Sequence, residues 1–105
     1  MNFQETLATL PPVDGLTGLD VVDGAGNVVH HIPAAPGKMG SLRVFNALAA
    51  AYGGAFSAEA AAQGLAWFAE HTADARAHPG AHPNIDLLLH HGAVQAGWRL
   101  VPLRG

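Results

Sequence analysis

Glycine and proline divide this chain of 105 residues into short segments, and each break has an expected structural role. Pro11–Pro12 ends a first helix, because the proline ring blocks helix continuation. Gly53–Gly54 ends a later helix, and Pro79–Gly80 forms a turn after the next one. The chain is therefore restricted to short elements, and its length predicts a single domain over residues 1–105.

The apolar pattern between these breaks predicts two strands that form a hairpin and a third strand near the C-terminus. Residues 19–23 and 28–32 are rich in β-branched side chains and flank the glycine-rich turn 24–27. Residues 98–101 form the last strand, and Pro102 places its end near a sheet edge.

Polar residues that can cap helices mark where the helices begin. Asn2 and Glu5 have the spacing of a reciprocal cap. Ser41 is expected to cap a helix that runs to about Tyr52, and Ser57 to cap the longest helix, which ends between residues 77 and 79. Asn84 is expected to cap a last short helix. The prediction is an α+β domain in which a three-stranded, mainly antiparallel sheet is packed by three to four helices.

The composition excludes several classes of protein. Half of the residues are apolar, and five lysines and arginines with a net charge of −3 argue against nucleic-acid binding. Absence of cysteine excludes disulfides and thiolate metal sites. The N-terminus has no secretory signal, and no apolar run approaches the roughly 20 residues that cross a bilayer. We therefore expect a cytoplasmic bacterial-type protein without a membrane partner.

The segment 70–86 holds three of the seven histidines and three carboxylates. Each residue turns an ideal helix by about 100°. With Leu65 facing the core, Trp67, His71 and Asp74 point to the opposite side, and His78 joins them if the helix extends that far. A large exposed tryptophan suggests that another subunit or element covers this stripe. The stripe is therefore a candidate ligand site or a contact between subunits.

Imidazoles and carboxylates also suit a divalent transition metal. His71, Asp74 and His78 offer a row of ligands on the helix, and the turn could bring His82 back to them. The spacing is not diagnostic of a metal site. Helix-end and turn roles explain much of the same pattern, since Asp74 can bond to His78 and Asp86 lies in a first helical turn. Both interpretations stay open.

A second candidate site lies in the glycine-containing loop before the helix that Ser41 is expected to cap. Lys38, Ser41 and Arg43 lie at this helix N-terminus, where free N–H groups and the helix dipole favour a small anion. The glycine spacing does not match a Walker motif. The alternative is a flexible connector with a serine cap.

The remaining histidines occur in two adjacent pairs. His30 and His31 lie on a strand and face opposite sides, so they cannot chelate one ion together. On the last helix, His90 points to solvent and His91 lies near the direction of Leu87. We interpret all four as surface or interface residues.

Three stretches resemble a family of short bacterial proteins of uncharacterised function. They are residues 40–48 (GSLRVFNAL), 64–72 (GLAWFAEHT) and 78–86 (HPGAHPNID). The resemblance covers nearly the whole chain and implies a stand-alone bacterial domain. It brings no reaction, cofactor or catalytic residue.

Three hypotheses follow for the function. The first is a binding or interaction protein that self-associates through the stripe with Trp67. The second is a metal-dependent enzyme or metal-binding protein that uses His71, Asp74, His78 and His82. The third is a binder of a small anion at Lys38, Ser41 and Arg43.

Overall fold

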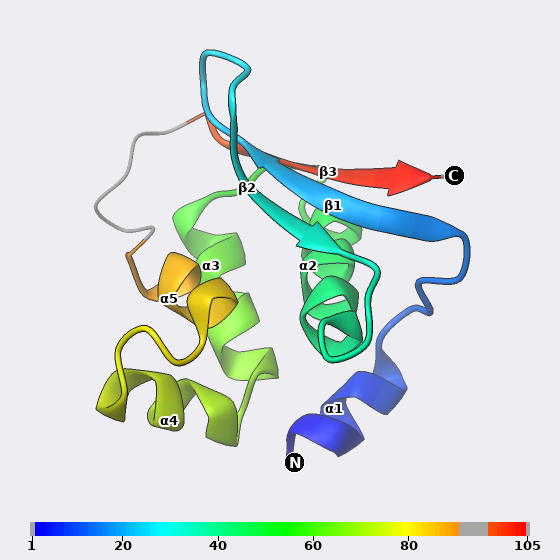
Figure 1. Cartoon of the computed structure of the whole chain (residues 1–105). Coiled ribbons are helices and arrows are strands. Elements are labelled where there is room, and N and C mark those ends of the chain that lie inside the picture. Colours follow the sequence, from blue (N-terminus) through cyan, green and yellow to red (C-terminus); the bar gives the residue numbers. More distant parts are fainter. Residues whose placement is uncertain (1, 91–96, 105) are drawn as a thin grey trace.

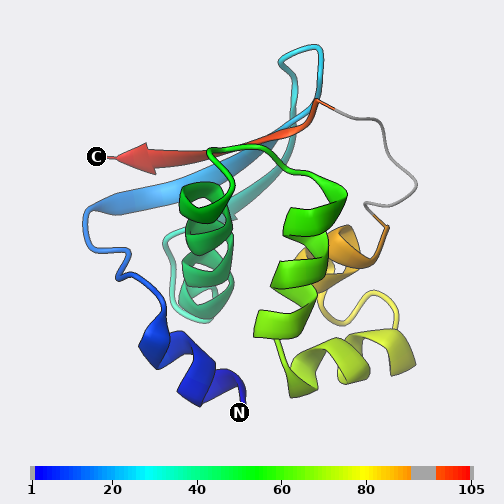
Figure 2. The same ribbon diagram turned by 180° about the vertical axis from the view of Figure 1, so that it is seen from behind.

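The computed structural model describes residues 2–90 and 97–104, which form a sheet covered on one face by helices (Figures 1 and 2). In chain order the elements are α1 (Phe3–Thr9), β1 (Leu16–Val22), β2 (Val28–Pro33), α2 (Met39–Ala51), α3 (Ala58–Trp67), α4 (Glu70–Ala77), α5 (Pro83–His90) and β3 (Arg99–Arg104). The α+β prediction is confirmed, with one helix more than the three to four expected among these residues. None of the described helices has the length and apolar character needed to cross a membrane.

The sheet has the strand order β2-β1-β3. Both strand pairs are antiparallel, which confirms the mainly antiparallel sheet predicted from the sequence. In the hairpin turn, Asp23 Oδ1 accepts hydrogen bonds from the N–H groups of Ala25 and Asn27, both at 2.9 Å. Gly26 takes a positive φ of 90° there, which glycine adopts without steric cost. Pro102 lies inside β3, which is tolerated because β3 is an edge strand.

Helix α2 packs against the sheet beside α3 and carries much of the core (Figure 2). The ring of Phe45 meets the rings of Phe56 and Phe68 edge-on, with centroids 6.2 and 6.4 Å apart. The largest fully buried side chains come from the sheet, α2, the connection between α2 and α3, and α5: Phe45, Phe56, Leu19, Ile32, Leu42, Leu48, Leu88, Val21 and Val44. One continuous core therefore fixes the positions of the helix ends that face away from the sheet.

Two of the four predicted helix caps are confirmed and two are wrong. Asn2 and Glu5 form the reciprocal cap, and Ser57 Oγ accepts from Ala60 N–H at 3.1 Å. Ser41 does not cap α2, because the helix begins two residues earlier, at Met39. Asn84 does not cap α5, because Pro83 occupies its first position, where a missing N–H costs nothing.

The difference between the two serines predicts different effects on stability when each is replaced by alanine. Replacing Ser57 by alanine removes a cap and should lower the free energy of unfolding by about 1 kcal/mol. Replacing Ser41, which lies inside α2 and makes no side-chain hydrogen bond in the described part of the chain, should leave it unchanged or slightly raised. Urea unfolding of both variants measures this, and equal losses would contradict the assignment.

The single long helix expected between residues 57 and 77 is also wrong, because the chain turns sharply at Ala69. Ala69 has φ 52° and ψ −121°, and His71 N–H donates to Phe68 C=O at 3.0 Å. These values describe a type II′ turn that separates α3 from α4. Thr72 Oγ1 donates to Leu65 C=O at 2.6 Å across the turn. The turn changes the direction in which His71 points relative to Trp67.

Candidate functional site

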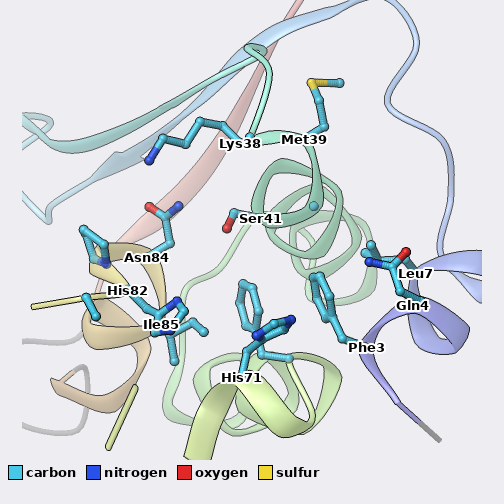
Figure 3. A pocket seen from close by; sticks show the side chains of 15 residues that line it. Phe3, Gln4, Leu7, Lys38, Met39, Ser41, His71, His82, Asn84 and Ile85 are labelled. Carbon is cyan, nitrogen blue, oxygen red and sulfur yellow. The ribbon is translucent and has the colours of Figure 1, made fainter. Parts of the chain in front are cut away.

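A pocket of about 430 Å³ lies among the helices, where four segments of the chain meet (Figure 3). The segments are α1, the loop before α2 with the first turn of α2, the turn between α3 and α4 with the first residues of α4, and the loop before α5 with the start of α5. The lining residues are Phe3, Gln4, Leu7, Gly37, Lys38, Met39, Gly40, Ser41, Phe68, His71, Ala81, His82, Pro83, Asn84 and Ile85.

One part of the pocket presents hydrogen-bond donors and a positive charge. Lys38 extends toward Asn84, and the hydroxyl of Ser41 points into the space between Asn84 and His71 (Figure 3). Lys38 forms no ion pair within residues 2–90 and 97–104, and none of the described lining residues is acidic. This part of the pocket therefore favours a negatively charged group.

The first turns of α2 and α5 both line this part of the pocket. The N–H groups of Gly40, Ser41, Asn84 and Ile85 have no acceptor among the described residues. Such groups at a helix start remain open to a ligand or water, and the helix dipole adds to the attraction for an anion. They supplement the Lys38 charge.

The other part of the pocket is aromatic and apolar. The rings of Phe3 and Phe68 stack with centroids 5.5 Å apart, and His71 meets Phe3 edge-on at 4.8 Å. A Cβ on Gly40 would lie 3.2 Å from ring carbons of Phe3, so glycine at this position lets α1 approach α2 closely. Leu7 completes this wall. An apolar portion of a ligand can be accommodated here.

Glu70 joins the two helices that carry this aromatic wall. Its Oε1 accepts a hydrogen bond from Phe3 N–H at 2.8 Å, across 67 residues of sequence. Hydrogen bonds from its own N–H and from Phe3 N–H hold the pKa of the Glu70 carboxyl below its ordinary value. The carboxylate therefore stays charged over a wide pH range and keeps α1 against α4.

His82 reaches the pocket with one ring nitrogen already engaged. Its Nε2 lies 2.5 Å from Asp74 Oδ2, while His78 Nδ1 lies 3.3 Å from the other oxygen, Oδ1. The hydrogen bond with His82, together with the charges of both imidazoles, holds the pKa of Asp74 below its ordinary value. Because the folded pKa is the lower one, this stabilisation is present above the unfolded pKa and is lost as pH falls through the folded pKa.

Asn84 is held in the same way by a residue from the sheet. His30 Nε2 lies 2.6 Å from Asn84 Oδ1 and joins β2 to α5. His30, which the sequence predicts as a surface or interface residue, is half-buried and contacts Asn84 of the pocket lining. The sequence carried a signal for this: His30 shares the inward side of β2 with buried Ile32, two residues away.

The structure brings together half of the residues singled out from the sequence. Lys38 and Ser41 line the same pocket as His71 and His82. The predicted site residues that lie outside the pocket make structural contacts instead. Arg43 donates to the C=O groups of Leu10 and Pro11, at 2.8 and 3.2 Å.

The outward stripe expected from Trp67, His71 and Asp74 does not form as one surface, because the helix turns at Ala69. Trp67 is half-buried and packs against the core. Asp74 is exposed and bonds to His78, as the helix-end interpretation expected.

Metal binding gains no support from this geometry. Within residues 2–90 and 97–104, no three His, Cys, Asp or Glu side chains gather in an arrangement that could hold a metal ion. The ring centroids of His71 and His82 are 6.0 Å apart. However, Nε2 of His82 and Nδ1 of His78 are both directed at the carboxylate of Asp74. Metal binding by these residues stays a prediction.

The other histidines lie away from the pocket. His31 Nδ1 pairs with Asp20 Oδ1 at 2.7 Å across β1 and β2, and its ring lies over Gly18, where a Cβ would meet it at 2.8 Å. His90 is exposed, as expected. His91 lies outside the described residues.

Comparison with known families agrees with the resemblance noted from the sequence. The model of a family described as an uncharacterised protein conserved in bacteria (DUF2322) matches residues 3–100. No curated protein and no solved structure matches the chain significantly.

Proposed function

The chain belongs to this family of uncharacterised bacterial proteins, and we propose that it binds a small organic anion in the pocket between α1, α2, α4 and α5. The observation that carries the proposal is the lining itself. A lysine, a hydroxyl, two amides and two imidazoles share one cavity with an aromatic wall and, among the described residues, with no carboxylate. A cytoplasmic location stays part of the proposal.

The volume of the pocket, and its division into a positively charged part and an apolar part, support a small ligand with an anionic group and an apolar group. A volume of about 430 Å³ lies in the range of small-molecule sites, which are mostly apolar with a few polar groups that orient the ligand. The anionic group would lie near Lys38 and Ser41, and the apolar part would lie near Phe3 and Leu7. The two candidate sites of the sequence, one at the loop and one at the histidines, thereby become parts of one site.

Isothermal titration calorimetry with phenyl phosphate, benzoate and phenethylamine tests this proposal. The two anions carry a phenyl ring that fits the apolar wall, and phenethylamine carries the same ring with a positive charge. We expect saturable binding of the anions and none of the amine. Binding of the amine with equal affinity, or of none of the three probes, would contradict the proposal.

Substitution of Lys38 by alanine should weaken phenyl phosphate binding by about 10- to 100-fold, because a charge-assisted hydrogen bond is worth about 1.5–3 kcal/mol. The matched control is Arg76→Ala. Arg76 is an exposed cation on α4 that does not line the pocket, so its loss changes net charge alone. An equal loss of affinity in both variants would indicate a non-specific effect of charge.

Self-association remains a second candidate, on a different surface from the one expected. Val28 and Val29 are 57% and 44% exposed on β2, an edge strand of the three described strands. Exposed apolar edge strands can pair with another chain. Sedimentation velocity of the wild type and of Val29→Lys tests this: a dimer that the substitution dissociates supports it, and a monomer at all concentrations contradicts it.

A further inference from the structure

We propose that Asp74, which lies outside the pocket, is a positioning residue that sets the tautomer of His82, so that the bound anion carries a hydroxyl group next to its anionic group. This inference rests on the proposed function and adds the chemical class of the ligand to it.

The hydrogen bond between Asp74 and His82 determines which ring nitrogen is left for a ligand. A carboxylate accepts hydrogen bonds and donates none, so Nε2 of His82, 2.5 Å from Asp74 Oδ2, carries the hydrogen. In the neutral ring, Nδ1 is then an acceptor. Nδ1 has no partner among the described residues, and the His82 side chain lines the pocket and is 30% exposed.

Asn84, two residues after His82, offers a hydrogen-bond donor rather than an acceptor. His30 Nε2 lies 2.6 Å from Asn84 Oδ1, which as an amide oxygen accepts the hydrogen of the imidazole. The amide nitrogen of Asn84 remains for a ligand, and it points toward Ser41 (Figure 3). Asn84 and His82 both line this wall of the pocket, so we take the Asn84 amide nitrogen as the donor and Nδ1 of His82 as the acceptor for one ligand.

A simple carboxylate or phosphate ester can satisfy only the donors of this wall. It would accept from Asn84, Ser41 and Lys38 and would leave Nδ1 of His82 without a partner. A polar group that loses water and finds no partner costs free energy, and a site built to bond a hydroxyl discriminates against the analogue that lacks it. A hydroxyl adjacent to the anionic group supplies the missing donor. Because His82 stays partly exposed, we expect about tenfold discrimination, at the lower end of hydrogen-bond effects.

Mandelate and phenylacetate form a matched pair for the test, because they differ by one hydroxyl on the carbon next to the carboxylate. Titrations and the ¹⁵N measurements are made at the same pH, about 8. The wild type should bind one enantiomer of mandelate about tenfold more tightly than phenylacetate.

Asp74→Asn should abolish this preference while both compounds still bind. The amide of the new residue can donate to Nε2, which moves the ring hydrogen to Nδ1 and removes the acceptor. The ¹⁵N chemical shifts of His82 report the tautomer directly and should show Nε2–H in the wild type and Nδ1–H in the variant. Asp14→Asn, an exposed carboxylate outside the pocket, is the control and should keep the preference.

The outcomes separate this inference from the proposed function. Equal affinity of the wild type for mandelate and phenylacetate would overturn the inference and leave anion binding standing. A preference that survives in Asp74→Asn, with Nε2–H retained, would overturn the role of Asp74. Absence of binding of either compound and of phenyl phosphate would overturn both proposals.

Discussion

Ala69→Gly is expected to raise the free energy of unfolding by about 1–2 kcal/mol, although glycine usually destabilises a chain. The reason is the backbone of Ala69, whose φ of 52° and ψ of −121° belong to the first central position of a type II′ turn, where glycine is favoured. The relief of strain exceeds the extra conformational entropy that glycine gives to the unfolded chain. Urea unfolding measures the gain.

Ala73→Gly is the matched control, because Ala73 is an exposed residue inside α4 with helical neighbours on both sides. There the same change should cost about 1 kcal/mol. Opposite signs for the two substitutions would establish the turn between α3 and α4. A loss at both positions would mean that residues 57–77 form the continuous helix that the sequence predicts.

Gly64→Val is expected to lower the free energy of unfolding by about 2–3 kcal/mol. Gly64 lies where α3 meets α2 and α5, and a Cβ there would lie 2.8 Å from Leu88 Cδ1 and 3.0 Å from Leu48 Cδ1. Both leucines are fully or nearly fully buried, so they have little room to move. The extra atoms would push α5 away and with it the pocket wall at Asn84, and affinity for phenyl phosphate should fall as well.

Ala62→Val separates this packing effect from helix propensity, because Ala62 is exposed on the same helix. It introduces the same β-branched side chain and should cost less than about 1 kcal/mol. Thermal unfolding of both variants, followed by calorimetric titration, makes the comparison. Similar losses in the two variants would show that α3 does not approach α5 as closely as described.

The features of this fold that are set by local chemistry were predictable from sequence. The hairpin follows from β-branched runs around a glycine-rich turn, and the caps at Asn2 and Ser57 follow from short polar side chains before apolar periodicity. In these places the residue type and the neighbouring pattern point to the same structure, and no distant contact competes with them.

The break at Ala69 was not predictable, because alanine is the residue most favourable to a helix and no glycine or proline marks the turn. Hydrogen bonds to residues outside α4 determine the position of this break instead. Glu70 bonds to Phe3, and Thr72 bonds to Leu65 across the turn. Asn84 was assigned as a cap for a related reason: its partner, His30, is 54 residues away and could not be known from local spacing.

The candidate site also depends on contacts between distant segments, which local sequence patterns do not predict. Sequence reasoning found Lys38 and Ser41 as one site and His71 and His82 as part of another, each from its local pattern. Only the packing of α1 and α5 around the start of α2 places them in one pocket. Phe3 belongs to that pocket because Gly40 permits the close approach of α1 to α2.

The central claim, anion binding at this pocket, is tested most directly by titrating ¹⁵N-labelled protein with phenyl phosphate and following the backbone amide resonances. The largest changes are expected at the first turns of α2 and α5, at Gly40, Ser41, Asn84 and Ile85, and they should saturate together with one dissociation constant. Changes that concentrate on the sheet or on α3, or the absence of saturable changes, would contradict the claim.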